Sequence, residues 1–66
     1  MRTEFTIICT YPNGKKSFSQ YPKKYYDLAF FEFKKAKNIY EPQGVKVEFF
    51  EIVYYGSSYH HSRKIA

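Results

Sequence analysis

Apolar and polar residues alternate at the start of the chain. Over residues 3–11, one side of an extended chain carries the apolar side chains Phe5, Ile7, Cys9 and Tyr11. A period of two in a segment rich in β-branched and aromatic residues predicts a β-strand. Cys9 then lies on the core face, where we interpret it as a small buried hydrophobic residue and not as a nucleophile.

The Pro-Asn-Gly segment at residues 12–14 predicts a hairpin turn, followed by a short polar strand over residues 15–20. Two turns compete. A two-residue type I′ turn pairs Cys9 with Phe18 and places Phe18 in the core. A type I turn with the proline at its second position, followed by a glycine bulge, pairs Phe18 with Ile8 on the other face. A slip of one residue changes the face of the whole strand, so burial should decide, and we favour the first turn.

Residues 22–40 carry apolar side chains at helical spacing. At about 100° per residue, one stripe contains Tyr25, Tyr26, Ala29, Phe33, Ala36 and Tyr40. Proline is favoured at the first helical position, and the Glu-Pro-Gln-Gly run after Tyr40 ends the helix. Phe31 falls on the opposite, lysine-rich face, either as an ordinary exposed aromatic residue or as a contact residue.

Residues 45–55 predict a third strand, in which the alternation changes phase. Val45, Val47 and Phe49 share one face, whereas Phe50, Ile52 and Tyr54 share the other. Either a bulge at Phe49 and Phe50 turns the second half of the strand, or the strand is apolar on both faces.

The order strand, strand, helix, strand predicts an α+β fold. We expect a two-layer sandwich, in which one helix covers one face of a three-stranded antiparallel sheet of order 2-1-3. Residues 1–56 are expected to form a single compact domain. Residues 57–66 show no pattern and are expected to be a flexible basic tail.

This layout leaves one face of the sheet uncovered. With a straight third strand, that face carries Ile8, Phe50, Ile52 and Tyr54. A contiguous apolar patch in this position marks an interface, so we expect a partner protein or a second copy to pack there. A bulge would turn Ile52 and Tyr54 inward and leave only Ile8 and Phe50. The outer edge of the third strand offers a further way to pair with a partner's sheet.

The 66-residue chain has a formal net charge of +5 and a pI near 9.4. Basic residues mixed with aromatic ones are typical of nucleic-acid-binding surfaces. The candidate contacts for such a surface are Lys23, Lys24, Lys34, Lys35, Arg63 and Lys64. With only two arginines and no recognised nucleic-acid-binding motif, a solvated lysine-rich helix face is the commoner interpretation.

The sequence offers little chemistry for an enzyme. No paired carboxylates are expected to converge, and no glycine-rich phosphate loop occurs. His60 and His61 are adjacent and point apart in an extended chain, which makes a poor metal site. We therefore expect no catalysis, and no cofactor, metal ion or small-molecule substrate.

A single cysteine allows no internal disulfide, which fits a reducing compartment. No segment approaches the roughly 20 apolar residues of a membrane span, and the first residues lack the apolar run of a signal peptide. We expect a cytoplasmic protein that does not associate with membranes.

Lysine, tyrosine, phenylalanine and isoleucine are abundant, and tryptophan is absent, a mixture that AT-rich codons produce. A low-GC bacterium, or its phage or plasmid, is a plausible source. We expect a small non-catalytic protein-binding module, encoded by a phage or mobile element, that inhibits or modulates a host protein. It would bind through the uncovered sheet face and the helix that carries Phe31. The alternative is a basic nucleic-acid-binding module.

Overall fold

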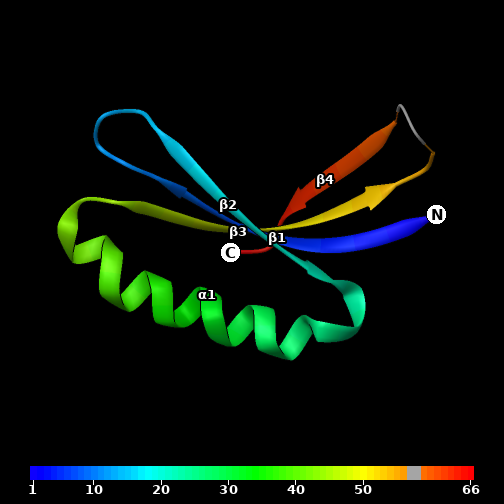
Figure 1. Ribbon diagram of the computed structural model, residues 1–66, viewed down its shortest axis with the longest axis horizontal. Helices are drawn as coiled ribbons and strands as arrows, with labels where there is room; N and C mark the ends of the chain where they lie inside the picture. The colour runs from blue at the N-terminus through cyan, green and yellow to red at the C-terminus, as the bar shows by residue number, and fades with distance from the viewer. Residues whose placement is uncertain (57–58) are drawn as a thin grey trace.

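The structure of the protein, a computed structural model, describes residues 1–56 and 59–66. Over these residues the chain forms one antiparallel sheet with one α-helix on one face (Figure 1). The elements are β1 (Arg2–Thr10), β2 (Lys16–Pro22), α1 (Tyr26–Tyr40), β3 (Lys46–Tyr54) and β4 (His60–Lys64). The sheet order is β2-β1-β3-β4, so the predicted α+β class is confirmed, whereas the prediction of three strands is wrong.

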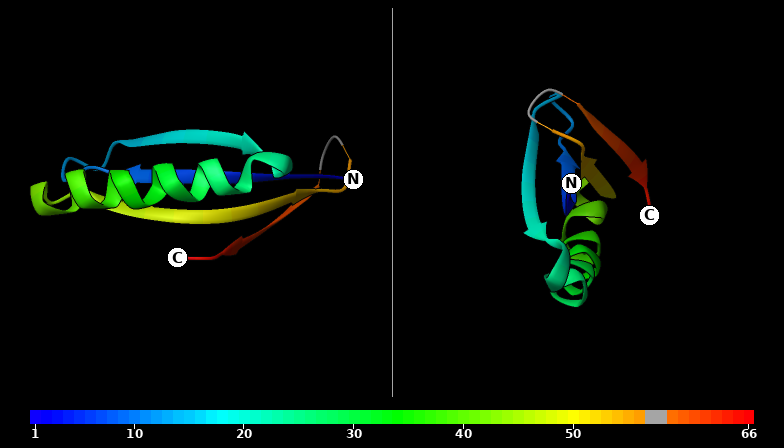
Figure 2. Two further views of the ribbon diagram at one scale, coloured as in Figure 1. Left: turned by 90° about the horizontal axis from the view of Figure 1, so that it is seen from below. Right: turned by 90° about the vertical axis from the view of Figure 1, so that its right-hand side faces the viewer.

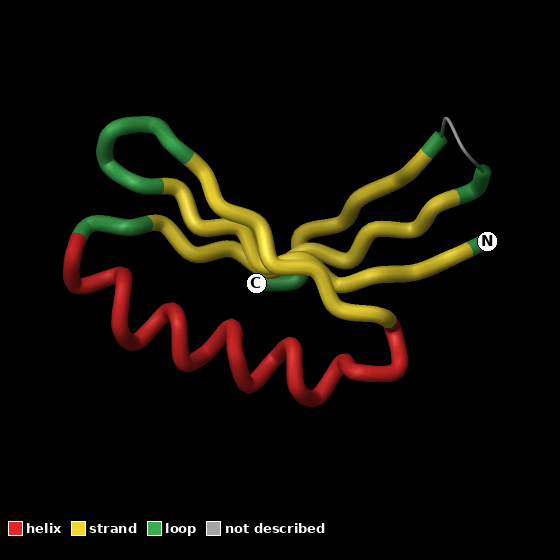
Figure 3. The backbone as a smooth tube through the Cα atoms, in the orientation of Figure 1, coloured by secondary structure: helices red, strands yellow, loops and turns green. Residues whose placement is uncertain are grey.

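The helix lies lengthwise along one face of the sheet, and no other described segment crosses the opposite face (Figure 2). The strands cross one another when the sheet is viewed from its side (Figure 3), as the twist of β-sheets requires. The molecule therefore has two layers, and one side of the sheet is open. We call this side the open face.

The core lies between α1 and the two central strands. Phe49 and Ala29 are fully buried, and Phe33 nearly so. The ring centroids of Phe33 and Phe49 are 5.2 Å apart, and those of Phe5 and Phe49 are 5.8 Å apart. The absence of a large side chain at Ala29 lets the helix approach the sheet, so that aromatic rings can fill the space on either side. The predicted core position of Cys9 is confirmed, since the residue is buried.

Residues that we expected to lie in the tail form β4 (His60–Lys64), which runs antiparallel to β3. Beyond this strand, the N–H of Ile65 donates to the carbonyl of Phe49 at 2.8 Å. An ion pair of 3.1 Å joins Arg63 to Glu51. All five residues of β4 are exposed, so the strand has no apolar alternation that a sequence pattern could reveal.

The turn between β1 and β2 is the one that we did not favour. The register pairs Ile8 with Phe18. The N–H of Gly14 donates to the carbonyl of Tyr11, and the N–H of Tyr11 donates to the carbonyl of Lys15, both at 2.8 Å. With Gly14 at a φ of 88°, this is a type I turn followed by a glycine bulge.

Proline explains why the two-residue turn is not formed. In that turn, Pro12 would stand at the closing pair, where a residue must both donate and accept a backbone hydrogen bond, and proline has no N–H. The side chain of Asn13 supports the observed turn, because its Oδ1 accepts a hydrogen bond from the N–H of Lys15 at 3.0 Å. The prediction that Phe18 lies in the core is therefore wrong, and its side chain is 61% exposed on the open face.

Strand β3 is straight. Its pairing with β1 continues without interruption from Arg2 opposite Tyr54 to Thr10 opposite Lys46, which excludes the bulge. The strand is therefore apolar on both faces, the second of the two alternatives.

The helical region begins later than predicted. Pro22 is the last residue of β2, with an extended ψ of 153°, and a single 3₁₀ turn at Lys23–Tyr25 precedes α1. An edge strand tolerates proline, so β2 can include it. At the other end α1 stops at Tyr40 as predicted, followed by a 3₁₀ turn and by Gly44 in the left-handed conformation.

Candidate docking surfaces

The apolar residues predicted for the open face do lie opposite α1. Residues paired across antiparallel strands point to the same side of the sheet, and the paired Ile7 and Phe49 are buried beneath the helix. The neighbouring residue on each strand therefore points away from the helix. The open face thus carries Ile8, Phe50, Ile52 and Tyr54, each of them partly buried.

Polar side chains separate these apolar residues across the strands. Phe50 lies between Thr6 on β1 and Lys64 on β4, and Ile52 has Glu4 beside it. The apolar residues of β3 therefore form a column one strand wide and not a broad patch.

Most charges on the open face are already engaged with one another. A carboxylate oxygen of Glu48 lies 3.3 Å from Nζ of Lys64. Arg2 pairs with Glu4 at 3.2 Å, and its guanidinium carbon lies 4.5 Å from the centroid of the Tyr54 ring. A partner would have to compete with these internal contacts to reach the charges.

Thr6 shows how closely the side chains of the open face cover one another. It is only 1% exposed although no helix lies above it. Its Oγ1 makes no hydrogen bond to any described residue. Its neighbours across the strands are Gln20 and Phe50, on the same face. This face is therefore partly closed by its own side chains.

Phe18 is a residue of the open face that we did not predict to lie there. It lies on β2 directly beside Ile8. The missing N–H of Pro12 is the sequence signal for this position, and our prediction, which relied on the burial of an aromatic ring, did not take it into account.

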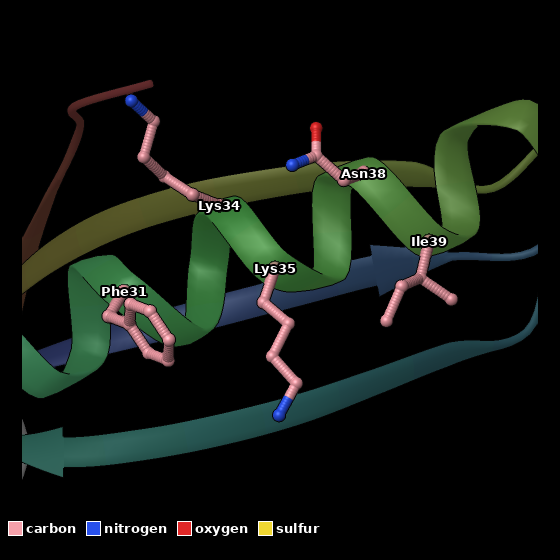
Figure 4. Close-up of a pocket in the computed structure, with 5 residues that line it drawn as sticks. All are labelled: Phe31, Lys34, Lys35, Asn38 and Ile39. Carbon is pink, nitrogen blue, oxygen red and sulfur yellow. The ribbon is translucent and has the colours of Figure 1, made fainter.

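The outer face of α1 is much more exposed. Phe31 is 62% exposed, and it lines an open depression with Lys34, Lys35, Asn38 and Ile39. Figure 4 shows Phe31, Lys35 and Ile39 projecting toward the side of β2, and Lys34 and Asn38 projecting the other way. Ile39 is 48% exposed, so the depression has apolar groups at both ends and lysines between them.

The six basic residues proposed for nucleic acid do not form one surface. Lys23 and Lys24 lie in the 3₁₀ turn, about 15 Å along the helix axis from Lys34. Arg63 and Lys64 lie on β4, where each pairs with a carboxylate of β3. No ion pair among the described residues involves Lys34 or Lys35.

Strand β4 occupies the edge of β3 from Phe50 to Tyr54, so a partner cannot pair there. Residues 46–48 of β3 have no partner strand on that side among the described residues. The outermost strands of the sheet are β2 and β4.

The buried position of Cys9 leaves its thiol within the core. Among the described residues, no group of three or more His, Cys, Asp or Glu side chains could hold a metal ion. The described part of the chain also contains no helix that is long and apolar enough to cross a membrane.

The chain matches no family model, no curated protein and no solved structure. Its function must therefore be argued from its own surfaces.

Proposed function

We propose that this chain is a small non-catalytic protein-binding module, and that the outer face of α1 docks on an acidic surface of another protein. The observation that carries the proposal is Phe31, an aromatic side chain 62% exposed at one end of a depression that also contains two lysines. A large aromatic ring in this position loses its contact with water only when a partner covers it.

The depression has the composition of a binding hot spot. Exposed aromatic residues anchor many interfaces, and surrounding charges guide the approach of a partner of opposite sign. Lys34 and Lys35 supply this charge, since no described carboxylate pairs with them. The net charge of +5 adds to the attraction of an acidic partner.

The open face makes a smaller contribution. Apart from Phe18 on the edge strand, its apolar residues are already partly buried, so covering them would remove less surface from water. The finer prediction, that the partner is a host protein inhibited or modulated by a phage or mobile-element product, rests on composition alone.

Affinity capture from a nuclease-treated bacterial lysate tests the proposal. We expect Phe31→Ala to weaken capture of the bound protein by at least about tenfold, as for an anchor residue. Tyr59→Ala is the matched control, because Tyr59 is an equally exposed aromatic residue, at 60%, outside the depression. Equal capture by both variants would contradict the proposal.

Nucleic acid is the second candidate, favoured by the two unpaired lysines beside an aromatic ring on which a base can stack. Titration of a labelled single-stranded oligonucleotide at several salt concentrations tests it. A log–log slope of about 0.7 per phosphate contacted, reduced in a Lys34→Gln, Lys35→Gln variant, would support this candidate. Salt-insensitive or absent binding would remove it.

A further inference from the structure

The outer edge of β2 is exposed along nearly its whole length. Six of its seven residues are exposed, and only Tyr21 is partly buried. No described segment pairs with this edge. The middle of the strand carries Phe18, a large aromatic residue with 61% of its surface exposed. A long edge strand with an apolar centre is a template for another strand.

The hydrogen bond that closes the hairpin determines which backbone groups face outward. The N–H of Tyr11 donates to the carbonyl of Lys15, and bonded pairs then recur at every second residue. In the observed register, the backbone groups of Ser17 and Ser19 therefore face β1. Those of the intervening residues, Lys16, Phe18 and Gln20, face outward. The backbone of Pro22 also faces outward, because Pro22 is two residues after Gln20, so its missing N–H removes no bond to β1.

We propose that two copies of the chain pair antiparallel through β2 and form a continuous eight-stranded sheet. A twofold axis beside Phe18 places it opposite the partner's Phe18, so that each residue donates and accepts one backbone hydrogen bond. The same axis places Lys16 opposite the partner's Gln20, also with outward-facing backbone groups. Lys16, Phe18 and Gln20 of each copy are then all paired.

The side chains of β2 fit a second copy in this register. A twofold interface must be complementary to itself, and here the aromatic residue meets its own equivalent across the strands. Lys16 meets a neutral amide and not another lysine, so the cations do not repel at the seam. Because Ile8 lies beside Phe18, the apolar row continues from one copy into the other on the open face.

The other edge of the sheet does not offer this fit. Strand β4 has five residues, and its sequence is His-His-Ser-Arg-Lys. Basic side chains on an edge strand oppose pairing with an identical strand. Of the two outermost strands, we therefore assign the pairing between copies to β2. The backbone groups that pair belong to β2 and not to α1, so this proposal does not depend on the proposed function.

Sedimentation over a range of concentrations tests the dimer. We expect the wild-type chain to dimerise, and Phe18→Lys to weaken dimerisation at least about tenfold by placing two cations at the axis. Phe31→Lys is the matched control, since it makes the same change at an equally exposed phenylalanine and should leave the dimer intact. A wild-type chain that stays monomeric at millimolar concentration would overturn the proposal.

A second variant and a second measurement locate the interface. Gln20→Pro removes one outward N–H and no bond to β1, so it should also weaken the dimer. The backbone amides of Phe18 and Gln20 should exchange with solvent more slowly as the concentration rises. A dimer that is unaffected by either substitution, or that leaves these amides unprotected, would show that another surface is used and would refute pairing through β2.

Discussion

The two outer surfaces of this molecule contain similar residues but differ in exposure. The outer face of α1 carries Phe31 at 62% exposure beside lysines without ion pairs. The open face carries Phe50 and Ile52, which are partly buried, among charges that pair with one another. Both surfaces mix aromatic residues with charges in the sequence. On the open face, the only comparably exposed large apolar side chain among the described residues of β1, β2 and β3 is Phe18, at 61%, on the edge strand β2.

Geometry accounts for the difference. On a sheet, each side chain has neighbours about 5 Å away on both adjacent strands as well as along its own strand. On the outer face of a lone helix, the neighbours lie only along the helix itself, at three and four residues. Thr6 therefore becomes buried without any covering layer, whereas Phe31 stays exposed. The apolar content of a segment is thus a poor measure of what it presents to a partner.

The largest expected effect is a difference in the free energy of unfolding between a variant of the open face and a variant of the outer face of α1. Phe50→Ala should lower the free energy of unfolding by about 2 kcal/mol, because the ring is partly buried against neighbouring strands. Phe31→Ala should change it by less than about 0.5 kcal/mol, as expected for an exposed residue. Urea denaturation of both variants measures this difference, and equal losses would show that the two surfaces are covered to the same extent.

A smaller effect of opposite sign is expected at the centre of the open face. Thr6→Val keeps the β-branched shape and removes a buried hydroxyl that bonds to no described residue. The variant should be more stable by about 1 kcal/mol, since an unsatisfied buried polar group is costly. Thr10→Val, also on β1 but less buried, is the control and should change stability less. A loss of stability in Thr6→Val would show that the hydroxyl has a partner in solution.

The smallest effect concerns the charges of the open face. The carboxylate of Glu48 lies 3.3 Å from Lys64 and 3.7 Å from Lys46. Glu48→Gln should therefore reduce the free energy of unfolding by about 0.5 kcal/mol, as is usual for surface ion pairs. The difference from wild type should shrink as the salt concentration rises. A difference that is independent of salt would indicate that the loss comes from packing and not from charge.

Local patterns in the sequence were sufficient for the two central strands, the helix and the core between them. Alternation placed Phe5, Ile7 and Phe49 toward the helix, and helical spacing placed Ala29 and Phe33 toward the sheet. The same parity placed Ile8 and Phe50 on the open face. These predictions succeeded because each depends only on the spacing of apolar residues within one segment. That spacing can be read directly from neighbouring residues in the sequence.

The sequence also contained the information that determines the hairpin register. Our prediction rested on the burial of Phe18 and did not consider the missing N–H of Pro12, which favours the other turn. The observed pairing of Phe18 with Ile8 shows that the backbone of the turn decided. An edge strand gains little from burying one ring, whereas a hairpin needs both hydrogen bonds of its closing pair.

Strand β4 and the exposure of each surface were decided only by tertiary structure. The sequence of β4 has no apolar period, and the strand is defined by its backbone pairing with β3. The exposed fraction of Phe31, Phe18 or Thr6 depends on neighbours that are distant along the chain. Periodicity reports which way a side chain points, but only the packing of separate segments determines what covers it.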